Sequence, residues 1–221
     1  MTVNHDVVGS NPARVVLYYI KQLFHYFYKP PLLKELMELD RAIQERRSIR
    51  KFSKKKPDWR EIIECIDAAR FAPMAGNCYS PRFILIDDTE KIKKLAEASQ
   101  QPFIAEANYV VIVTSNPDRT TNSFEERAEM YLRQQAGAAI QNFLLKITEK
   151  KLATCWIGAF ADDLVKEVTG IPGSVKVEAL FPIGYELKKP TTRQDKTSLD
   201  RILYFNKYGN KNMMHEKKIN A

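Results

Sequence analysis

The sequence predicts an α+β fold with one mixed sheet, because helical and strand-like segments alternate from residue 32 onward. Helical periodicity predicts several helices, the longest from about 124 to 150. The 221 residues, 44% of them hydrophobic, suit a single domain with a sizeable core. Short runs rich in β-branched and aromatic residues predict buried strands at 83–86, 109–113, 154–157 and 177–181.

Residues 1–38 are predicted to form an N-terminal helical extension. Residues 14–28 are crowded with apolar and aromatic side chains and are followed by Pro30-Pro31. The run is interrupted by polar residues and is shorter than the roughly 20 apolar residues that a bilayer span needs. It also lacks the cleavage pattern of a signal peptide. We expect a helix that packs on its own or a partner subunit, with contact at a membrane surface as the alternative.

One helix of the domain is predicted from a capping box. Asp58 is the expected N-cap, Glu61 stands three residues later, and apolar residues at helical spacing extend the helix to about Ala72-Pro73. Further helices are expected at 91–99 and 162–169. In the long helix, the small residues 136–139 would let another backbone approach closely.

Charge and composition exclude several classes of function. The net charge of +8 favours anionic ligands, but the basic residues occur in short scattered runs, which is not typical of dedicated nucleic-acid binding. The P-loop and G-x-G-x-x-G patterns are both missing, so a nucleotide must be held another way. Cys65, Cys78 and Cys155 form no C-x-x-C pair, and the three histidines are widely spaced. We therefore predict no disulfide framework, no metal site and a reducing cytoplasm.

A cluster of arginines follows a short helical segment, in the run Arg46-Arg47-Ser48-Ile49-Arg50. Guanidinium groups match phosphate oxygens bidentately. In an extended segment alternate residues share a face, so Arg46, Ser48 and Arg50 could meet one ligand while Arg47 and Ile49 face elsewhere. Arginines at a helix end are also commonly solvated or paired with acids, and the run alone does not decide between these interpretations.

Two later segments could also contact a ligand. Residues 72–81 form a Pro-, Gly- and Asn-containing loop, in which the Asn77 amide could bond a polyol or a ring carbonyl; a plain connector is the alternative. Gly158 follows a predicted strand, where a glycine lets a flat aromatic ring approach the backbone.

Taken in order, these segments resemble the flavin-dependent nitroreductase superfamily. Its members share an R-R-S-x-R segment, an A-P-S-A-x-N-like loop, a small-residue central helix, a W-I-G-like strand end and a P-I-G-Y-like strand, here at 181–185. The resemblance covers about 39–209 and leaves 210–221 as a C-terminal tail. It implies a mainly antiparallel central sheet flanked by helices, in an intertwined homodimer with FMN bound between the subunits.

The resemblance also implies a set of cofactor-binding residues. A basic residue near the C-terminus would reach the phosphate, either Lys196 or Arg193. Met74, Ala75 and Asn77 would come from the partner subunit, although Met74 replaces the usual serine. The flavin ring would lie on Trp156, Ile157 and Gly158, with a backbone N–H near Gly158 directed at flavin N5. The phosphate, ribityl chain and pyrimidine edge would be bound by Arg46, Arg47, Ser48 and Arg50.

The activity that the resemblance implies is ping-pong hydride transfer. NAD(P)H would reduce the flavin at N5, and a nitroaromatic, quinone or enone would reoxidise it, with no catalytic side chain required. The segment 115–133 is expected to choose the acceptor. The alternatives are a deiodinase-like dehalogenase, which would use acidic and aromatic residues of this segment, an FMN-storage protein without turnover, and a membrane-peripheral or nucleic-acid-associated protein.

Overall fold

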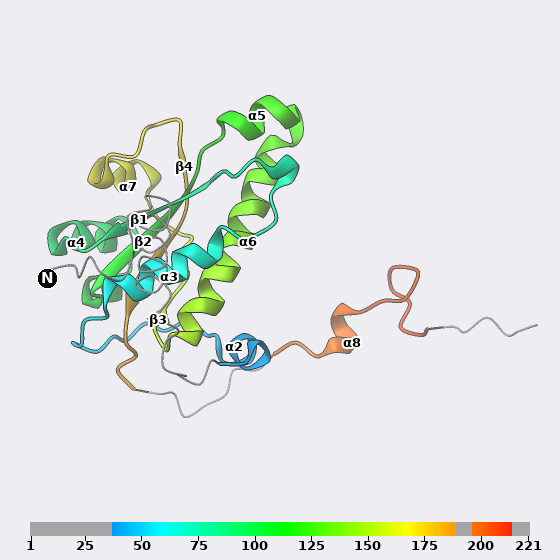
Figure 1. Ribbon diagram of the computed structural model, residues 1–221, viewed down its shortest axis with the longest axis horizontal. Coiled ribbons are helices and arrows are strands. Elements are labelled where there is room, and N and C mark those ends of the chain that lie inside the picture. The colour runs from blue at the N-terminus through cyan, green and yellow to red at the C-terminus, as the bar shows by residue number, and fades with distance from the viewer. Residues whose placement is uncertain (1–36, 189–195, 214–221) are drawn as a thin grey trace, which may run out of the picture. The chain divides into compact units, whose positions relative to one another are not determined.

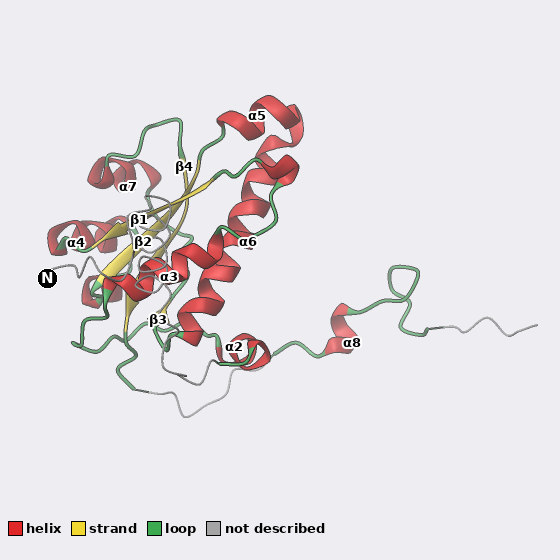
Figure 2. Ribbon diagram, in the orientation of Figure 1, coloured by secondary structure: helices red, strands yellow, loops and turns green. Residues whose placement is uncertain are grey.

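The computed structural model describes residues 37–188 and 196–213, and the chain divides into two compact units at Glu186/Leu187. The first unit is built on a four-stranded sheet with strand order β1-β2-β4-β3 (Figures 1 and 2). The strands are β1 Pro81–Ile86, β2 Tyr109–Ser115, β3 Ala153–Thr154 and β4 Lys176–Gly184. The α+β fold predicted from the sequence is confirmed.

All pairings among the described strands are antiparallel. The parallel component of the predicted mixed sheet therefore does not occur within the described part of the chain. The longest ladders join β2 to β1 and to β4, which places β2 and β4 at the centre of the sheet. β2 is buried along its whole length, as the apolar run 109–113 predicts for all but its last two residues.

β3 is shorter than the predicted strand 154–157, and Pro182 explains the interruption. Ala153 pairs with Gly184 and Thr154 with Ile183, and in the same register Ile157 forms an isolated bridge with Leu180. Leu180 exchanges both of its backbone hydrogen bonds with Ile157. Residue 182 stands two positions later and points its amide the same way, toward Cys155, but proline has no N–H to donate. The ladder breaks at this point.

The two faces of the sheet bury separate cores. On one face, residues such as Val111 and Phe181 pack against α3 (Trp59–Ala69) and α6 (Ala128–Glu149). On the other, residues such as Ile112 and Leu180 pack with residues of α4 (Thr89–Ala98) and α7 (Asp162–Thr169). Phe143 of α6 is fully buried between Phe83 and Phe181, with ring centroids 6.0 and 5.5 Å away.

Only one of the two hydrogen bonds of the capping box predicted for α3 is present. The Asp58 side chain accepts a hydrogen bond from Arg60 N, as an N-cap should. The Glu61 carboxylate instead accepts from the hydroxyl of Tyr185 at 3.3 Å, so the reciprocal bond of the box is not made. The helix ends at Ala69, three residues before the predicted end, because the residue before Pro73 is disfavoured in helical geometry.

The other helices agree with prediction except at their ends. α7 has its predicted bounds, and α4 begins two residues early, since Asp88 caps it by accepting from Glu90 N and Lys91 N. The predicted helix 124–150 begins four residues late, at Ala128 in α6. A helix that was not predicted, α5 Asp118–Phe124, ends before Glu125, whose φ of 43° is incompatible with a right-handed helix, and η4 Glu125–Arg127 leads into α6. The remaining elements of this unit are α2 Leu39–Glu45, η2 Ala75–Asn77 and η3 Pro102–Glu106.

The second unit, from Leu187 onward, contains one short described helix, α8 Leu199–Ile202. The Lys211 ammonium lies 4.0 Å from the ring centroid of Tyr204, which in turn packs against Tyr208 at 4.8 Å. The N-terminal helix predicted at 14–28 lies outside the described residues. No helix in the described ranges is both long and apolar enough to cross a bilayer.

Candidate functional site

The arginine-rich segment runs beside the end of the sheet formed by β3 and β4. Ile49 N donates to Thr154 O at 2.8 Å, and Ser53 N donates to Tyr185 O at 2.8 Å. Ile49 and Phe52 pack into a small core with Ala153. These backbone and apolar contacts fix the path of the segment and leave its polar side chains for other partners.

The Phe52 ring needs the glycine of the P-I-G-Y-like motif. A Cβ on Gly184 would lie 3.0 Å from Phe52 Cδ1 and 3.4 Å from two further atoms of the same side chain. The glycine therefore lets the ring lie flat on β4, and this contact anchors the arginine segment against the strand.

The alternation expected along the segment is present. Arg47 forms an ion pair with Glu186, two residues after the end of β4, and Ile49 packs inward. Ser48 and Arg50 are exposed and Arg46 is half-buried. Among the described residues, no acid pairs with Arg46 or Arg50. Residues 46–56 carry seven Arg or Lys residues and no acid, so this surface has a strong positive potential.

Two buried polar atoms next to the segment have no hydrogen-bond partner among the described residues: Arg47 Nε and Thr154 Oγ1. Buried polar groups are usually satisfied, and an unsatisfied one commonly marks the position of a ligand or an ordered water. A guanidinium N–H and a hydroxyl are both suitable donors for phosphate or hydroxyl oxygens. The chemistry of this donor set fits a phosphorylated polyol such as the ribityl phosphate of FMN.

A flat, open surface follows β3. Trp156 is 44% exposed and packs edge-on against Phe181, with ring centroids 5.6 Å apart. A Cβ on Gly158 would meet a single atom, Trp156 Nε1 at 3.9 Å. The backbone N–H of Gly158 donates to no acceptor in the described part of the chain. An aromatic ring could therefore lie against this backbone and receive its hydrogen bond.

The third predicted group, Met74, Ala75 and Asn77, lies elsewhere. Its loop contacts the N-terminal half of α6 at Gln135, whereas the arginine segment lies beside Thr154, beyond the C-terminal end of that helix (Figure 1). The structure therefore brings together the groups around Arg46–Arg50 and Trp156–Gly158, but not the loop. Lys196 is exposed and belongs to the second unit, and Arg193 lies outside the described residues.

Sequence reasoning missed Thr154, Glu186 and Gln135. Thr154 and Glu186 follow from the strand register, which could not be read from the sequence. Gln135 could have been noticed in the sequence, because it is a polar residue at helical spacing from Leu132 and Ala139, on the buried face of α6. An amide at such a position needs several buried partners.

None of the three cysteines is fully exposed. Burial raises the pKa of the Cys65 thiol to about 12, so this group stays protonated in the folded protein. Cys155 is also buried, and Cys78 is half-buried in the 74–80 loop. Burial and the Glu61 carboxylate raise the pKa of Tyr185, which therefore remains a neutral hydrogen-bond donor.

The model of the Nitroreductase family matches residues 43–101 and 98–185, together more than half of the chain. The chain belongs to the nitroreductase family. This nitroreductase family member is 28% identical over 169 residues to a putative NADH dehydrogenase/NAD(P)H nitroreductase of Archaeoglobus fulgidus, a match that spans 73% of this chain and 94% of the relative.

Solved structures support the family fold. A nitroreductase family protein from Clostridium novyi NT aligns with a TM-score of 0.63 at 26% identity, over 79% of this chain and 96% of the other. An FMN-dependent nitroreductase from Clostridium difficile aligns with a TM-score of 0.65 at 22% identity, over 76% and 98% of the two chains, and this likeness concerns the fold alone.

Proposed function

We propose that this family member is an FMN-dependent oxidoreductase that takes hydride from NAD(P)H and passes electrons to a nitroaromatic, quinone or enone acceptor. The observation that carries the proposal is the adjacency of a basic segment, 46–50, to an open backbone surface, 156–158, through the hydrogen bond from Ile49 N to Thr154 O at 2.8 Å. The phosphate and the flat ring are the two chemically different ends of FMN. The basic segment suits the phosphate, the open backbone surface suits the ring, and these two surfaces are adjacent.

Each part of the site has a distinct role in binding FMN. Arg46 and Ser48 would hold the phosphate and the ribityl chain, and the donors Arg47 Nε and Thr154 Oγ1 would complete this set. Arg50 would supply positive charge at the pyrimidine edge, which stabilises an anionic reduced ring. Trp156, Ile157 and Gly158 would line the ring, and the unused backbone N–H of Gly158 would be its hydrogen-bond donor.

When bound, FMN supplies reversible hydride chemistry that no side chain of the protein offers. The protein orients the cofactor, excludes water from one ring face with Trp156, and supplies the positive field of residues 46–56. No side chain is required as a general acid or base. The segment 115–133 contains no lysine, which deiodinase-like relatives use together with a glutamate and a tyrosine, and this favours the NAD(P)H oxidoreductase over that alternative.

The functional unit is a homodimer in this proposal. An isologous dimer with antiparallel α6 helices would bring the Met74–Asn77 loop of one subunit to the 46–50 and 156–158 surfaces of the other. The exposed side of α6 permits a close approach, because no atom lies within 4 Å of a Cβ built on Gly137. In a single chain the Met74–Asn77 loop lies away from the rest of the site. In this dimer it would contact the cofactor of the partner subunit.

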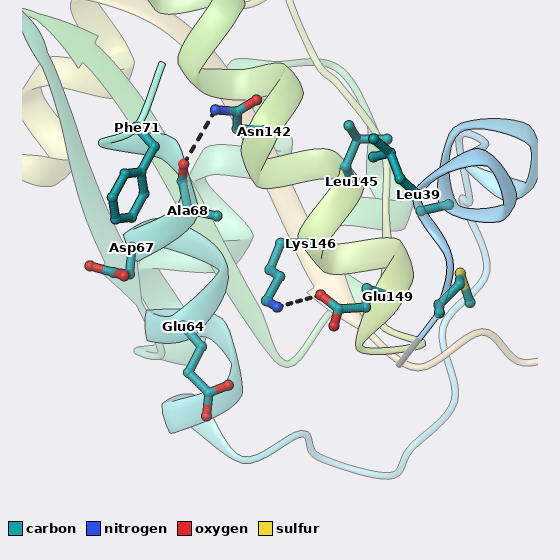
Figure 3. Close-up of a pocket in the computed structure, with 11 residues that line it drawn as sticks. Leu39, Glu64, Asp67, Ala68, Phe71, Asn142, Leu145, Lys146 and Glu149 are labelled. Atoms are coloured by element: carbon teal, nitrogen blue, oxygen red, sulfur yellow. Dashed lines mark hydrogen bonds and ion pairs between the residues drawn. The ribbon is translucent and has the colours of Figure 1, made fainter. Parts of the chain in front are cut away.

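A groove of about 620 Å³ between α2, α3 and α6 is a further surface for the second copy (Figure 3). Side chains from the three helices and the residues after α3 border it, among them Leu39 from α2, Phe71 two residues after α3 and Leu145 from α6. Leu39 and Phe71 are 63% and 69% exposed, which is unfavourable for large apolar groups that stay in water. Burial in a dimer removes that cost.

The proposal is tested on the purified full-length protein. We expect a yellow protein with bound FMN, or an apoprotein that takes up FMN, and steady-state oxidation of NADH or NADPH with menadione or a nitroaromatic as acceptor. A colourless protein that gains no FMN on reconstitution would refute the cofactor. Bound flavin that neither nucleotide bleaches under anaerobic conditions would instead favour a storage protein.

A further inference from the structure

The side chain of Gln135 is buried against a surface loop. It lies on α6, is 3% exposed, and is the only amide side chain among the buried polar residues of the described chain. Its neighbours on the buried face of the helix, Leu132 and Ala139, are apolar. A primary amide in such a place is costly unless its donors and acceptor are all used.

The Gln135 amide is used fully by the loop that follows α3. In the amide orientation that satisfies every neighbour, Nε2 donates to Cys78 O at 3.1 Å and to Ser80 Oγ at 2.7 Å, and Oε1 accepts from Ala75 N at 3.2 Å. These contacts lie at the first residue of η2 (Ala75) and at one and three residues beyond its end (Cys78 and Ser80). One side chain therefore holds both ends of a tight turn.

The turn itself is in an uncommon conformation. Gly76 and Asn77 are consecutive residues with φ of 52° and 55°, and within the turn Cys78 N donates to Ala75 O at 3.0 Å. Asn77 is not a glycine, so its left-handed conformation has a steric cost. On the other side of the turn, the Phe124 ring lies so close that a Cβ on Gly76 would be 2.9 Å from it.

There is room beside the turn for it to move. A cavity of about 460 Å³ lies between the loop and α6, bordered by Met74, Ala75, Tyr131 and Gln135 among others. Without the hydrogen bonds to Gln135, the backbone N–H of Ala75 and the carbonyl of Cys78 would lose their partners next to this space. The loop could then shift into the cavity.

We propose that Gln135 is a positioning residue of the flavin site, which sets the geometry of Met74–Asn77 toward the cofactor held by the partner subunit. This inference rests on the proposed function. Gln135 touches neither cofactor nor substrate in this proposal and acts only through the backbone of Ala75 and Cys78. Its loss should therefore loosen the contacts of the loop with the flavin while leaving the arginine segment and the 156–158 surface unchanged.

The test compares Gln135→Leu with Gln134→Leu in the full-length protein. Gln134 borders the same cavity but is exposed and has no hydrogen bond among the described residues, so it is a matched control for lost polarity. For Gln135→Leu we expect the dissociation constant of FMN to rise about 10-fold, the scale of one lost hydrogen bond. We also expect an altered visible spectrum of bound FMN and faster amide exchange in residues 73–80. Gln134→Leu should change none of these.

The outcomes separate this inference from the function on which it rests. If the wild-type protein binds FMN and Gln135→Leu shows the same affinity, spectrum and exchange, the positioning role is wrong and the proposed function stands. If the wild-type protein binds no FMN, both are overturned. Should Gln135→Leu fail to fold, Gln135→Glu keeps the acceptor for Ala75 N and loses the donor to Cys78 O. For this variant we expect a smaller rise in the FMN dissociation constant, about 3-fold. An unchanged FMN affinity and an unchanged spectrum of bound FMN would overturn the proposal.

Discussion

Replacing Arg47 by methionine removes the ion pair between the arginine segment and Glu186, just beyond β4. Methionine is an unbranched side chain, so it retains much of the apolar stem of the arginine. The pair is partly buried, with side chains 26% and 19% exposed for Arg47 and Glu186. Exposed pairs contribute about 0.2–1 kcal/mol, and breaking a buried pair costs about 3–5 kcal/mol. We therefore expect Arg47→Met to lower the free energy of unfolding by about 2 kcal/mol, since Glu186 would be left without its partner.

The loss is bounded by the contacts that remain. The backbone hydrogen bonds from Ile49 N and Ser53 N, each 2.8 Å, and the packing of Phe52 do not depend on the Arg47 side chain. The segment should stay folded, and the melting temperature should fall by roughly 4–8 °C for a chain of this size. FMN affinity should fall as well, because Arg47 Nε is one of the donors assigned to the cofactor.

The assay is chemical denaturation of Arg47→Met, Glu186→Gln and the double variant. We expect a coupling energy of about 1–2 kcal/mol between the two positions. The control is Glu90→Gln, whose pair with Lys93 has side chains 75% and 54% exposed and should show no measurable loss. A coupling below about 0.3 kcal/mol would mean that the backbone bonds alone hold the segment, and our account of the pair would be wrong.

Three further outcomes are expected. Arg46→Ala should weaken FMN binding by about 1–3 kcal/mol in a fluorescence titration, the scale of lost charge-assisted hydrogen bonds, and unchanged occupancy would mean that the phosphate lies elsewhere. Phe143→Ala should lower the free energy of unfolding by about 3–5 kcal/mol, because the ring is fully buried between two others; a loss below about 1 kcal/mol would contradict the core described above. The pKa of Cys65 rises from 9.0 to about 12 on folding, so above pH 9 the unfolded chain releases a proton that the native protein keeps, and stability falls by about 1.4 kcal/mol per pH unit. Cys65→Ala removes this dependence, so the difference in unfolding free energy between wild type and variant should change steadily from pH 9 upward; a constant difference would refute the raised pKa.

Local patterns predicted the elements better than their ends. The period of two along residues 46–50 correctly separated inward Arg47 and Ile49 from outward Ser48 and Arg50, because side-chain direction in an extended segment is a local property. The interruption of β3 depends on which residue stands opposite Cys155. That partner is Pro182, and strand register is set by the whole sheet, so the interruption could not be predicted from either segment alone.

The late start of the long helix had a similar origin. Residues 124–150 contain no glycine or proline before Gly137, so nothing in the sequence marks Glu125 as non-helical. The positive φ of Glu125 arises where the Phe124 ring turns toward Gly76 and packs edge-on against Tyr131, with ring centroids 5.0 Å apart. A long-range contact overrides local helix propensity here.

The distance between the two halves of the site links cofactor binding to assembly. The Met74–Asn77 loop contacts α6 at Gln135, 14 residues and therefore about 21 Å along the helix from Glu149, the end beside the arginine segment. In the proposed site the loop contacts the flavin held by the partner subunit, so these contacts exist only in a dimer. By mass action, whatever binds the dimer more tightly than the monomer favours the dimer, and FMN affinity must rise with subunit association by the same factor. Gln135 lies on the helix that separates the two halves, and it fixes the one loop whose contribution depends on that association.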